Sequence, residues 1–211
     1  NPGTATCDDG AALCRERGCD VIVALGGGSA MDAAKAIAGL SVNVGSCAQY
    51  FGRETFKNGA LPIIAVPTTA GTGSEVTPYA VIVDGRCETN PGMKRTLGAR
   101  RLFPALALLD PELTLTLPPT ITANTGLDAL SQAIEGMVSR QSTPMGDILA
   151  LEACSIVRSW LPVAVAEGNH LEARAWMLYA AMLSGCVIAQ SGTTLVHGMG
   201  YYLTLYCGIP H

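Results

Sequence analysis

A short apolar run followed by three glycines and a helical pattern is the feature that most restricts how this chain can fold. The run DVIVAL, residues 20–25, is rich in β-branched side chains, which is typical of a strand buried on both faces. GGGSAMDAAKAIAG, residues 26–39, then supplies a tight turn and the apolar periodicity of a helix. Residues 61–67 repeat the buried-strand pattern, and 79–84 and 105–110 are further strand candidates. Strands that alternate with helices predict an α/β fold built on a parallel sheet.

Strand patterns end in the second half of the chain, where the periodicity becomes helical. In STPMGDILALEACSIVRSWLP, Thr143 is a candidate helix cap, and Pro144 suits the first helical turn. NHLEARAWMLYAAMLSG repeats this arrangement, with Asn169 as the expected cap. We therefore expect an α/β domain over residues 1–118, followed by an all-helical domain over residues 119–211.

The composition excludes several classes of protein. Net charge is −4 and no basic tract occurs, so nucleic acid is not an expected partner. No uninterrupted apolar run approaches the roughly 20 residues of a membrane span, so no membrane association is expected. Eight cysteines without a C-x-x-C pair indicate the reduced thiols of a cytoplasmic protein. The start without methionine, the end on GIPH and the 49% of apolar residues together suggest a segment of a longer protein.

Two loops that contain glycine follow successive predicted strands. The first opens a helix, and its residues are Gly26, Gly27, Gly28 and Ser29. Glycine lets a ligand approach the backbone closely, and a helix N-terminus presents N–H groups to an anion. The second loop, PTTAGTGSE, offers the hydroxyl groups of Thr68, Thr69, Thr72 and Ser74. Because parallel strands deliver such loops to one edge of a sheet, a shared nucleotide phosphate site is predicted. The alternative is a pair of turns that bind nothing.

A candidate metal site lies in the second half of the chain. Asp128 and Gln132 are four residues apart in TGLDALSQAIEG, so they share one helix face. His197 and His211 lie in apolar surroundings beside glycines, whereas His170 lies at a polar helix start and is expected in solvent. A carboxylate, an amide oxygen and two imidazoles can hold a divalent metal, iron(II) or zinc, with one position open for substrate. Spacing alone leaves open that these residues form only a polar helix stripe and ordinary histidines.

Four segments, in this order along the whole chain, resemble the iron-containing (group III) alcohol dehydrogenase family: GGGSAMDAAKA, PTTAGTGSEVTPYAVI, LLDPELTLTLPPTITANTGLDAL and LVHGMGYYL with GIPH. The resemblance implies a dinucleotide-binding α/β domain, a helical metal-binding domain and an active site in the cleft between them. It also implies reversible hydride transfer between NAD or NADP and a small primary alcohol, diol or aldehyde, in a protein that could be a homodimer.

The resemblance further implies roles for individual residues. The glycine turn would hold the pyrophosphate, and the other residues expected near the cofactor are Asp32, Thr68, Thr69, Thr72 and Lys94. The implied metal ligands are Asp128, His197 and His211. Gln132 stands where members of the family usually carry histidine. Tyr201, the candidate catalytic residue, stands where several members carry a histidine close to the substrate.

Two alternatives remain open from the sequence. One is a different enzyme on the same scaffold, either similar to glycerol dehydrogenase or a metal-independent reductase. The other is an inactive nucleotide-binding fragment. Metal analysis and an aldehyde panel with NADH and NADPH would distinguish among these possibilities.

Overall fold

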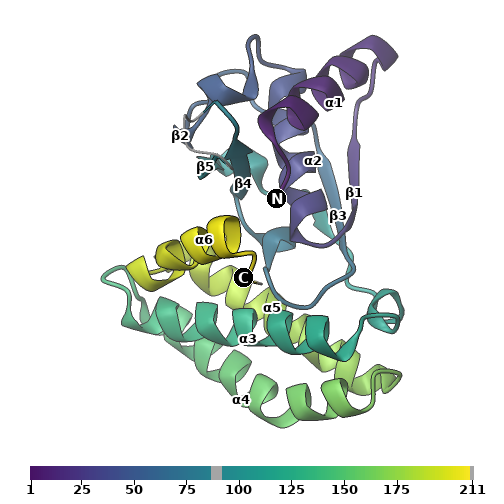
Figure 1. Ribbon diagram of the computed structural model, residues 1–211, viewed down its shortest axis with the longest axis vertical. Coiled ribbons are helices and arrows are strands. Elements are labelled where there is room, and N and C mark those ends of the chain that lie inside the picture. The colour runs from purple at the N-terminus through teal and green to yellow at the C-terminus, as the bar shows by residue number, and fades with distance from the viewer. Residues whose placement is uncertain (87–91, 210–211) are drawn as a thin grey trace. The chain divides into compact units, whose positions relative to one another are not determined.

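The computed structural model describes residues 1–86 and 92–209, which form two compact units (Figure 1). The α/β unit comprises Asn1–Val66 and Thr77–Leu108. The helical unit comprises Pro67–Val76 and the chain from Leu109 onward. This arrangement differs from a single division after residue 118, because the threonine-rich loop and the segment that precedes the first long helix of the helical unit both pack with the helices.

One sheet of the α/β unit has the strand order β1–β3–β6. Its strands are β1 (Ile22–Gly26), β3 (Ile63–Pro67) and β6 (Leu106–Ala107). β3 and β6 run parallel, with Ile64 opposite Leu106. The helices α1 (Thr4–Arg17) and α2 (Gly28–Ser41) pack on each other, and α2 also packs against β1. The buried apolar side chains between α2 and this sheet include Ala24, Met31, Ala34, Ile63 and Ala65. The predicted α/β class is confirmed.

A second sheet, with the order β2–β5–β4, was not predicted. Its strands are β2 (Gly52–Arg53), β4 (Tyr79–Asp84) and β5 (Met93–Gly98). β4 pairs antiparallel with β5, and β2 pairs parallel with it. The expectation that residues 79–84 belong to the parallel sheet is therefore wrong. The connection from β4 to β5 is too short for the crossover that parallel pairing requires, so these neighbours pair as antiparallel strands.

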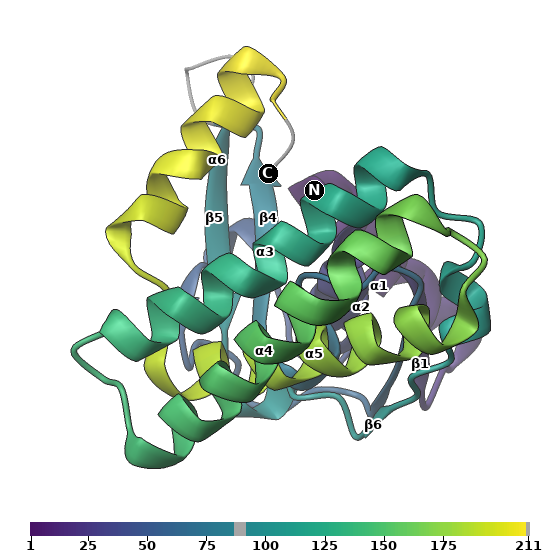
Figure 2. The ribbon, with the colours of Figure 1, turned by 90° about the horizontal axis from the view of Figure 1, so that it is seen from below.

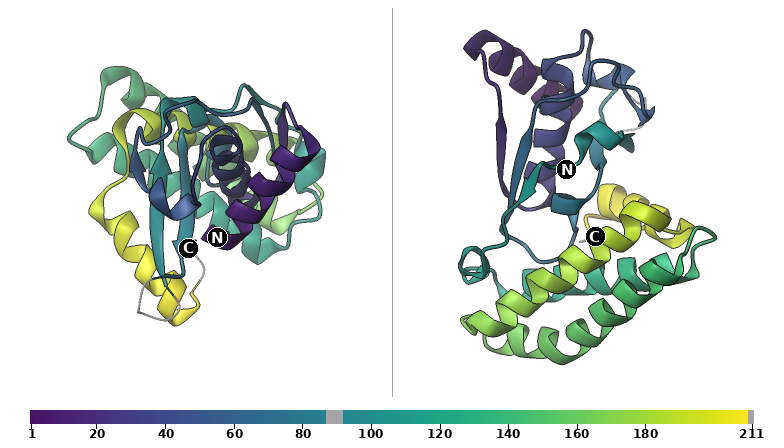
Figure 3. Two further views of the ribbon diagram at one scale, coloured as in Figure 1. Left: turned by 90° about the horizontal axis from the view of Figure 1, so that it is seen from above. Right: turned by 180° about the vertical axis from the view of Figure 1, so that it is seen from behind.

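The helical unit contains four long helices, of which α3, α4 and α5 pack side by side (Figure 2). Their bounds are α3 (Pro119–Val138), α4 (Pro144–Ala166), α5 (Leu171–Ser191) and α6 (Leu195–Cys207). Figure 3 shows the same bundle from two further directions. Its core is formed mainly by small and apolar side chains, among them Ala129, Ala133, Ala153, Ile156, Met177, Leu178 and Val187.

The first turns of α4 and α5 show which residues cap these helices. Thr143 Oγ1 accepts a hydrogen bond of 3.0 Å from the Gly146 amide, which confirms it as the cap of α4. At α5 the cap is His170, whose Nδ1 accepts a bond of 3.2 Å from the Ala173 amide. The expectation that Asn169 caps α5 is wrong, and His170 is half-buried at the helix start. Its ring nitrogen serves the same purpose as a short polar side chain, since it accepts from an unpaired first-turn amide.

α4 and α5 are long and apolar enough to cross a membrane by length and composition, with mean hydropathies of 1.6 and 1.2. This differs from the expectation that no segment reaches that length. In α5, 61% of the most apolar stretch is buried inside the structure, compared with 33% in α4. A core helix of a packed bundle is expected to have the same composition. Within residues 1–86 and 92–209 the seven cysteines are free, and Cys7, Cys14 and Cys47 are buried.

Candidate functional site

The glycine turn joins the end of β1 to the start of α2. Gly26 has φ +148°, and a Cβ added there would lie 2.7 Å from the Ala30 Cβ, so the position requires glycine. Gly27 is the N-cap, and among the described residues no side chain caps this helix end. Gly28 and Ser29 form its first turn. The predicted phosphate-binding residues are therefore adjacent on an uncapped helix N-terminus, which is suited to an anion.

Asp32 and Lys35 follow this turn on α2 and are both buried. Asp32 Oδ2 accepts a bond of 2.9 Å from the Val81 amide of β4. Lys35 Nζ donates to the Thr77 Oγ1 at 3.1 Å and to the Tyr79 carbonyl at 2.7 Å. Both side chains thus connect α2 to β4, and the cofactor contact expected of Asp32 stays a prediction. Lys94, expected near the ribose, is half-buried on β5.

The threonine-rich loop, residues 67–76, packs on the helical unit. A Cβ at Gly71 would lie 2.7 Å from the Thr125 carbonyl oxygen, so this glycine allows close contact with α3. Thr72 Oγ1 accepts from the Ser74 amide at 3.3 Å, which stabilises a local turn. The hydroxyl-bearing residues predicted to border the cofactor, Thr68, Thr69 and Thr72, are all half-buried.

The candidate metal helix is α3. Asp128 is half-buried on it, and Gln132 follows one turn later with only 3% of its surface exposed. The Gln132 Oε1 atom is buried and has no hydrogen-bond partner among the residues that the structure describes. A buried carbonyl oxygen without a partner costs free energy, on the order of 1–3 kcal/mol. A buried oxygen of this kind calls for an explanation, and a bound ion or water is one.

His197, the candidate ligand on α6, contacts a residue that the sequence did not single out. Its Nδ1 lies 3.2 Å from Oε1 of Glu135 on α3, and both side chains are about nine-tenths buried. The Tyr201 ring lies one helical turn after His197 and meets it edge-on, with the ring centroids 5.8 Å apart. The structure therefore brings His197 and Tyr201 together with α3. His211 lies outside the described residues.

Glu135 is held by several donors and is the functional candidate that sequence reasoning missed. Burial by itself raises the pKa of this carboxyl, but hydrogen bonds from Thr194 and Ser131 and the nearby His197 outweigh it, so the pKa lies below its usual value. The missed signal is spacing: Asp128, Gln132 and Glu135 follow an i, i+4, i+7 pattern, which places all three on one helix face.

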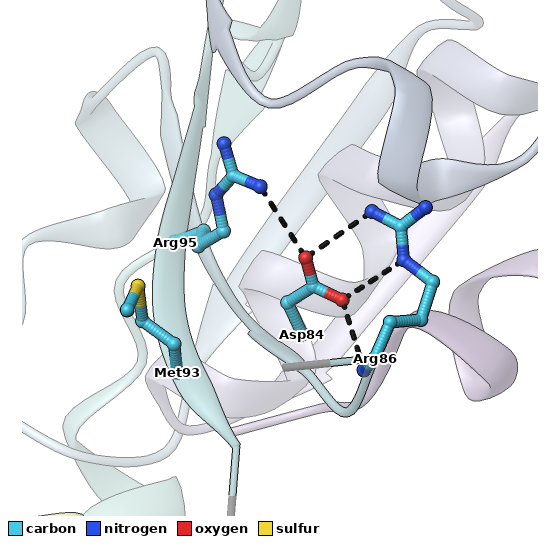
Figure 4. Close-up of a pocket in the computed structure, with 4 residues that line it drawn as sticks. All are labelled: Asp84, Arg86, Met93 and Arg95. Atoms are coloured by element: carbon cyan, nitrogen blue, oxygen red, sulfur yellow. Dashed lines mark hydrogen bonds and ion pairs between the residues drawn. The ribbon is translucent and has the colours of Figure 1, made fainter. Parts of the chain in front are cut away.

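A separate hollow of about 450 Å³ lies at the β4–β5 hairpin, lined by Asp84, Arg86, Met93 and Arg95 (Figure 4). Asp84 Oδ1 accepts from Arg86 Nε at 3.1 Å, and Asp84 Oδ2 accepts from Arg95 Nη1 at 3.3 Å. The Arg86 guanidinium holds the pKa of the Asp84 carboxyl below its usual value. Because both arginines are used by this carboxylate, the cluster is a structural ion-pair network of the hairpin.

Two sequence profiles match this chain. Residues 1–111 match the profile described as iron-containing alcohol dehydrogenase, and residues 122–211 match the C-terminal profile of the Fe-containing alcohol dehydrogenase family. The chain belongs to the iron-containing alcohol dehydrogenase family. The expected resemblance is confirmed.

Individual relatives of this family member agree with that assignment. Alcohol dehydrogenase 4 of Schizosaccharomyces pombe is 38% identical over 211 residues, which are 100% of this chain and 49% of that protein. The 1,3-propanediol dehydrogenase of Klebsiella pneumoniae is 37% identical over 100% of this chain and 54% of that protein. A crystal structure of sulfoacetaldehyde reductase from Bifidobacterium kashiwanohense in complex with NAD+ superimposes with a TM-score of 0.93 and 43% identity, covering 100% of this chain and 55% of that one. The chain thus spans about half the length of the curated relatives that it matches.

Iron gives the family its name, and the candidate ligands of this chain can be compared with what a divalent cation requires. The buried Gln132 Oε1 suits a divalent cation, because a cation would supply the partner that this oxygen does not find within residues 1–86 and 92–209. Within residues 1–86 and 92–209, histidine, cysteine and acidic side chains alone form no group of three that could hold a metal. A site built on Asp128 and His197 therefore depends on the Gln132 amide oxygen and on the fourth candidate, His211. Carboxylate, amide oxygen and imidazole are all accepted ligands of first-row divalent metals.

Proposed function

We propose that this protein, in its full-length form, is an NAD(P)-dependent and metal-dependent alcohol dehydrogenase or aldehyde reductase. Its substrates would be small primary alcohols, diols or aldehydes, and it would act in the cytoplasm, with a homodimer as a further proposal. Family membership over both halves of the chain supports the reaction class. The observation that carries the metal dependence is the buried Gln132 Oε1, which has no hydrogen-bond partner among the described residues and shares its helix face with Asp128.

The proposed roles follow from what each side chain can do. The amides at the start of α2 would bind the cofactor pyrophosphate, because that helix end is uncapped and carries partial positive charge. Asp128, Gln132, His197 and His211 would hold the metal. When bound, the nicotinamide supplies the hydride acceptor or donor, and the metal supplies a Lewis acid for the substrate oxygen. Tyr201, edge-on to His197, is the candidate to hold or deliver a proton through its phenol group.

The names of the relatives support this substrate class without fixing one substrate. They include an alcohol dehydrogenase, a 1,3-propanediol dehydrogenase and a sulfoacetaldehyde reductase, and the last was crystallised with NAD+. All three names describe an alcohol or aldehyde carbon of a small molecule. The proposal is therefore made at the level of the reacting group.

A second candidate function is a metal-independent reductase on the same scaffold. It is favoured by Gln132, an amide at a position where we expect histidine in the family. Within the described residues, no three histidine, cysteine or acidic side chains form a group that could hold a metal, and this also favours the metal-independent reductase.

The test uses the full-length protein, with metal content measured beside activity. We expect bound iron or zinc, and consumption of NADH or NADPH with small aldehydes that stops when the metal is removed by a chelator. Turnover that survives complete removal of metal would establish the metal-independent reductase. Binding of NADH without turnover of any aldehyde or alcohol would instead support an inactive nucleotide-binding protein.

Two variants separate the two proposed sites. Gly27→Val should abolish nucleotide binding and leave the metal in place, because a β-branched side chain at the N-cap would occupy the space of the pyrophosphate. His197→Ala should lose metal and turnover but keep nucleotide affinity, because the glycine turn and α6 belong to different units. Full metal occupancy in the His197→Ala protein would rule out His197 as an important ligand.

A further inference from the structure

The carboxylate of Glu135 receives hydrogen bonds at both of its oxygens. Oε1 accepts from Ser131 Oγ at 2.8 Å and contacts His197 Nδ1 at 3.2 Å. Oε2 accepts from the Thr194 amide at 2.7 Å and from the Thr194 Oγ1 at 2.8 Å. Only 6% of the residue is exposed. A carboxylate so deeply buried and so fully engaged is fixed in one orientation.

These contacts indicate which nitrogen of the His197 ring carries the proton. Both oxygens of Glu135 already accept hydrogen bonds from Ser131 and Thr194, so we interpret the Nδ1 contact as one more bond that the carboxylate accepts, from an N–H at that atom. In a neutral imidazole the lone pair then lies on Nε2. Metal-ligating histidines commonly show this arrangement, with one ring nitrogen on the metal and the other donating to a carboxylate.

The same carboxylate also anchors the beginning of the helix that carries His197. Thr194 is the N-cap of α6, and its hydroxyl group does not cap its own helix. Both of its donors instead reach across to Glu135 on α3. A negative charge beside a helix N-terminus is also favourable to the helix dipole. Ring orientation and helix position are therefore both set by one residue.

We propose that Glu135 is a positioning residue for the metal site: it holds His197 through Nδ1 and fixes the start of α6, so that Nε2 is the ring atom offered to the metal. The inference rests on the proposed metal-dependent function. Glu135 shares its helix face with Asp128 and Gln132, so α3 supplies both the proposed ligands and the support of a third.

The experiment measures Co(II) affinity of the full-length protein by the visible absorption of bound cobalt in competition with a chelator. Glu135→Gln should raise the Co(II) dissociation constant roughly 10- to 100-fold. Glu152→Gln, an exposed acid-to-amide change on α4, is the matched control and should leave the constant unchanged. Thr194→Val removes one of the two bonds to Oε2 and keeps the contact to His197, so it should weaken cobalt binding less than Glu135→Gln does.

A second measurement determines the tautomer of His197 directly. In the metal-free wild-type protein, ¹⁵N NMR of labelled histidines, assigned with His197→Ala, should show Nδ1–H at His197, and Glu135→Gln should shift that population. A merely structural role of Glu135 would not move this signal.

The outcomes separate this inference from the proposed function. Equal cobalt affinity of wild type and Glu135→Gln would overturn the positioning role while the metal site stands. An Nε2–H tautomer in the wild-type protein would overturn it even if the variant does not fold. Failure of the wild-type protein to bind Co(II) would overturn the metal-dependent function, and this inference with it.

Discussion

Gly73 and Gly185 lie backbone against backbone in the helical unit. A Cβ added to Gly73 would lie 2.4 Å from the Gly185 Cα, and a Cβ added to Gly185 would lie 2.7 Å from the Gly73 carbonyl oxygen. Gly73 also has φ +60°, a conformation that favours glycine. The two glycines of the AGTGSE segment therefore serve a packing purpose: Gly71 lets the loop lie close to α3, and Gly73 lets it lie directly on α5.

Gly185→Ala should destabilise the protein, because two of the three atoms nearest to the added Cβ are the Gly73 carbonyl oxygen and Cα, backbone atoms that cannot rotate away. Overpacking of this kind costs roughly 1–3 kcal/mol. Gly198→Ala is the matched control, since no neighbouring atom of the described residues lies within 4 Å of a Cβ at this exposed position in α6. It should stabilise the helix by up to about 1 kcal/mol. Urea unfolding of both variants tests the contrast, and equal midpoints would contradict the close contact.

Lys35→Met should lower stability more than nucleotide affinity. The fully buried ammonium group donates to the Thr77 hydroxyl and the Tyr79 carbonyl, and these bonds connect α2 to β4. Hydrogen bonds from charged groups contribute about 1.5–3 kcal/mol, so a loss of this order is expected. Lys57→Met, at an exposed position, is the control. If Lys35→Met instead weakened NADH binding at unchanged stability, Lys35 would be a cofactor contact.

The Asp84 network predicts a pH-dependent contribution to stability. Hydrogen bonding from Arg86 lowers the pKa of the folded-state carboxyl relative to the unfolded value of about 4. A lowered pKa means that the contribution is present above the unfolded pKa and is lost as pH falls through the folded one. Asp84→Asn should therefore be less stable than wild type at pH 7, and the difference should shrink in acid.

Salt provides the control for this prediction. The Arg86 and Arg95 side chains are 59% and 45% exposed, so ions in solution reach the network. Added salt at pH 7 should reduce the difference between wild type and Asp84→Asn. Chemical denaturation with urea, which carries no charge, gives both comparisons. A difference that is independent of pH and salt would assign the effect of Asp84 to packing.

The parts of the fold that the sequence predicts are those set by neighbouring residues. Thr143 was recognised as a cap because its role needs only the amide three residues later. β5 was missed because MKRTLG carries polar side chains, and its pairing with β4 is a tertiary fact. His170 replaces Asn169 as cap, which shows that a histidine nitrogen can compete with the usual short side chains.

The candidate site was predicted in the same uneven way. The glycine turn follows from local spacing, and the structure places its residues together at the start of α2. Glu135 was missed because an acid within a helix is usually solvated. Glu135 is buried and paired because Thr194 and His197, about sixty positions later in the chain, contact it in the folded structure. Residues that support ligands through long-range contacts are difficult to recognise from a single sequence.

Gln132→Leu should have opposite effects on stability and on metal binding. In the metal-free protein, Oε1 is a buried acceptor without a partner among the described residues, so an apolar side chain of similar size should raise the free energy of unfolding by about 1 kcal/mol. The same change should weaken metal binding, because it removes a proposed ligand. Gln132→His should strengthen it, since imidazole is usually the better donor for first-row metals.

The control for this experiment is Gln190→Leu, at an exposed position on α5, which should change stability by less than about 0.5 kcal/mol and leave metal affinity unaltered. Urea unfolding of the metal-free proteins and metal dissociation constants of the loaded ones give the two readouts. If Gln132→Leu gains stability while all dissociation constants agree within error, Gln132 is a buried amide that contributes no ligand. α3 would then contribute Asp128 alone, because a side chain whose removal leaves metal affinity unchanged is not a ligand.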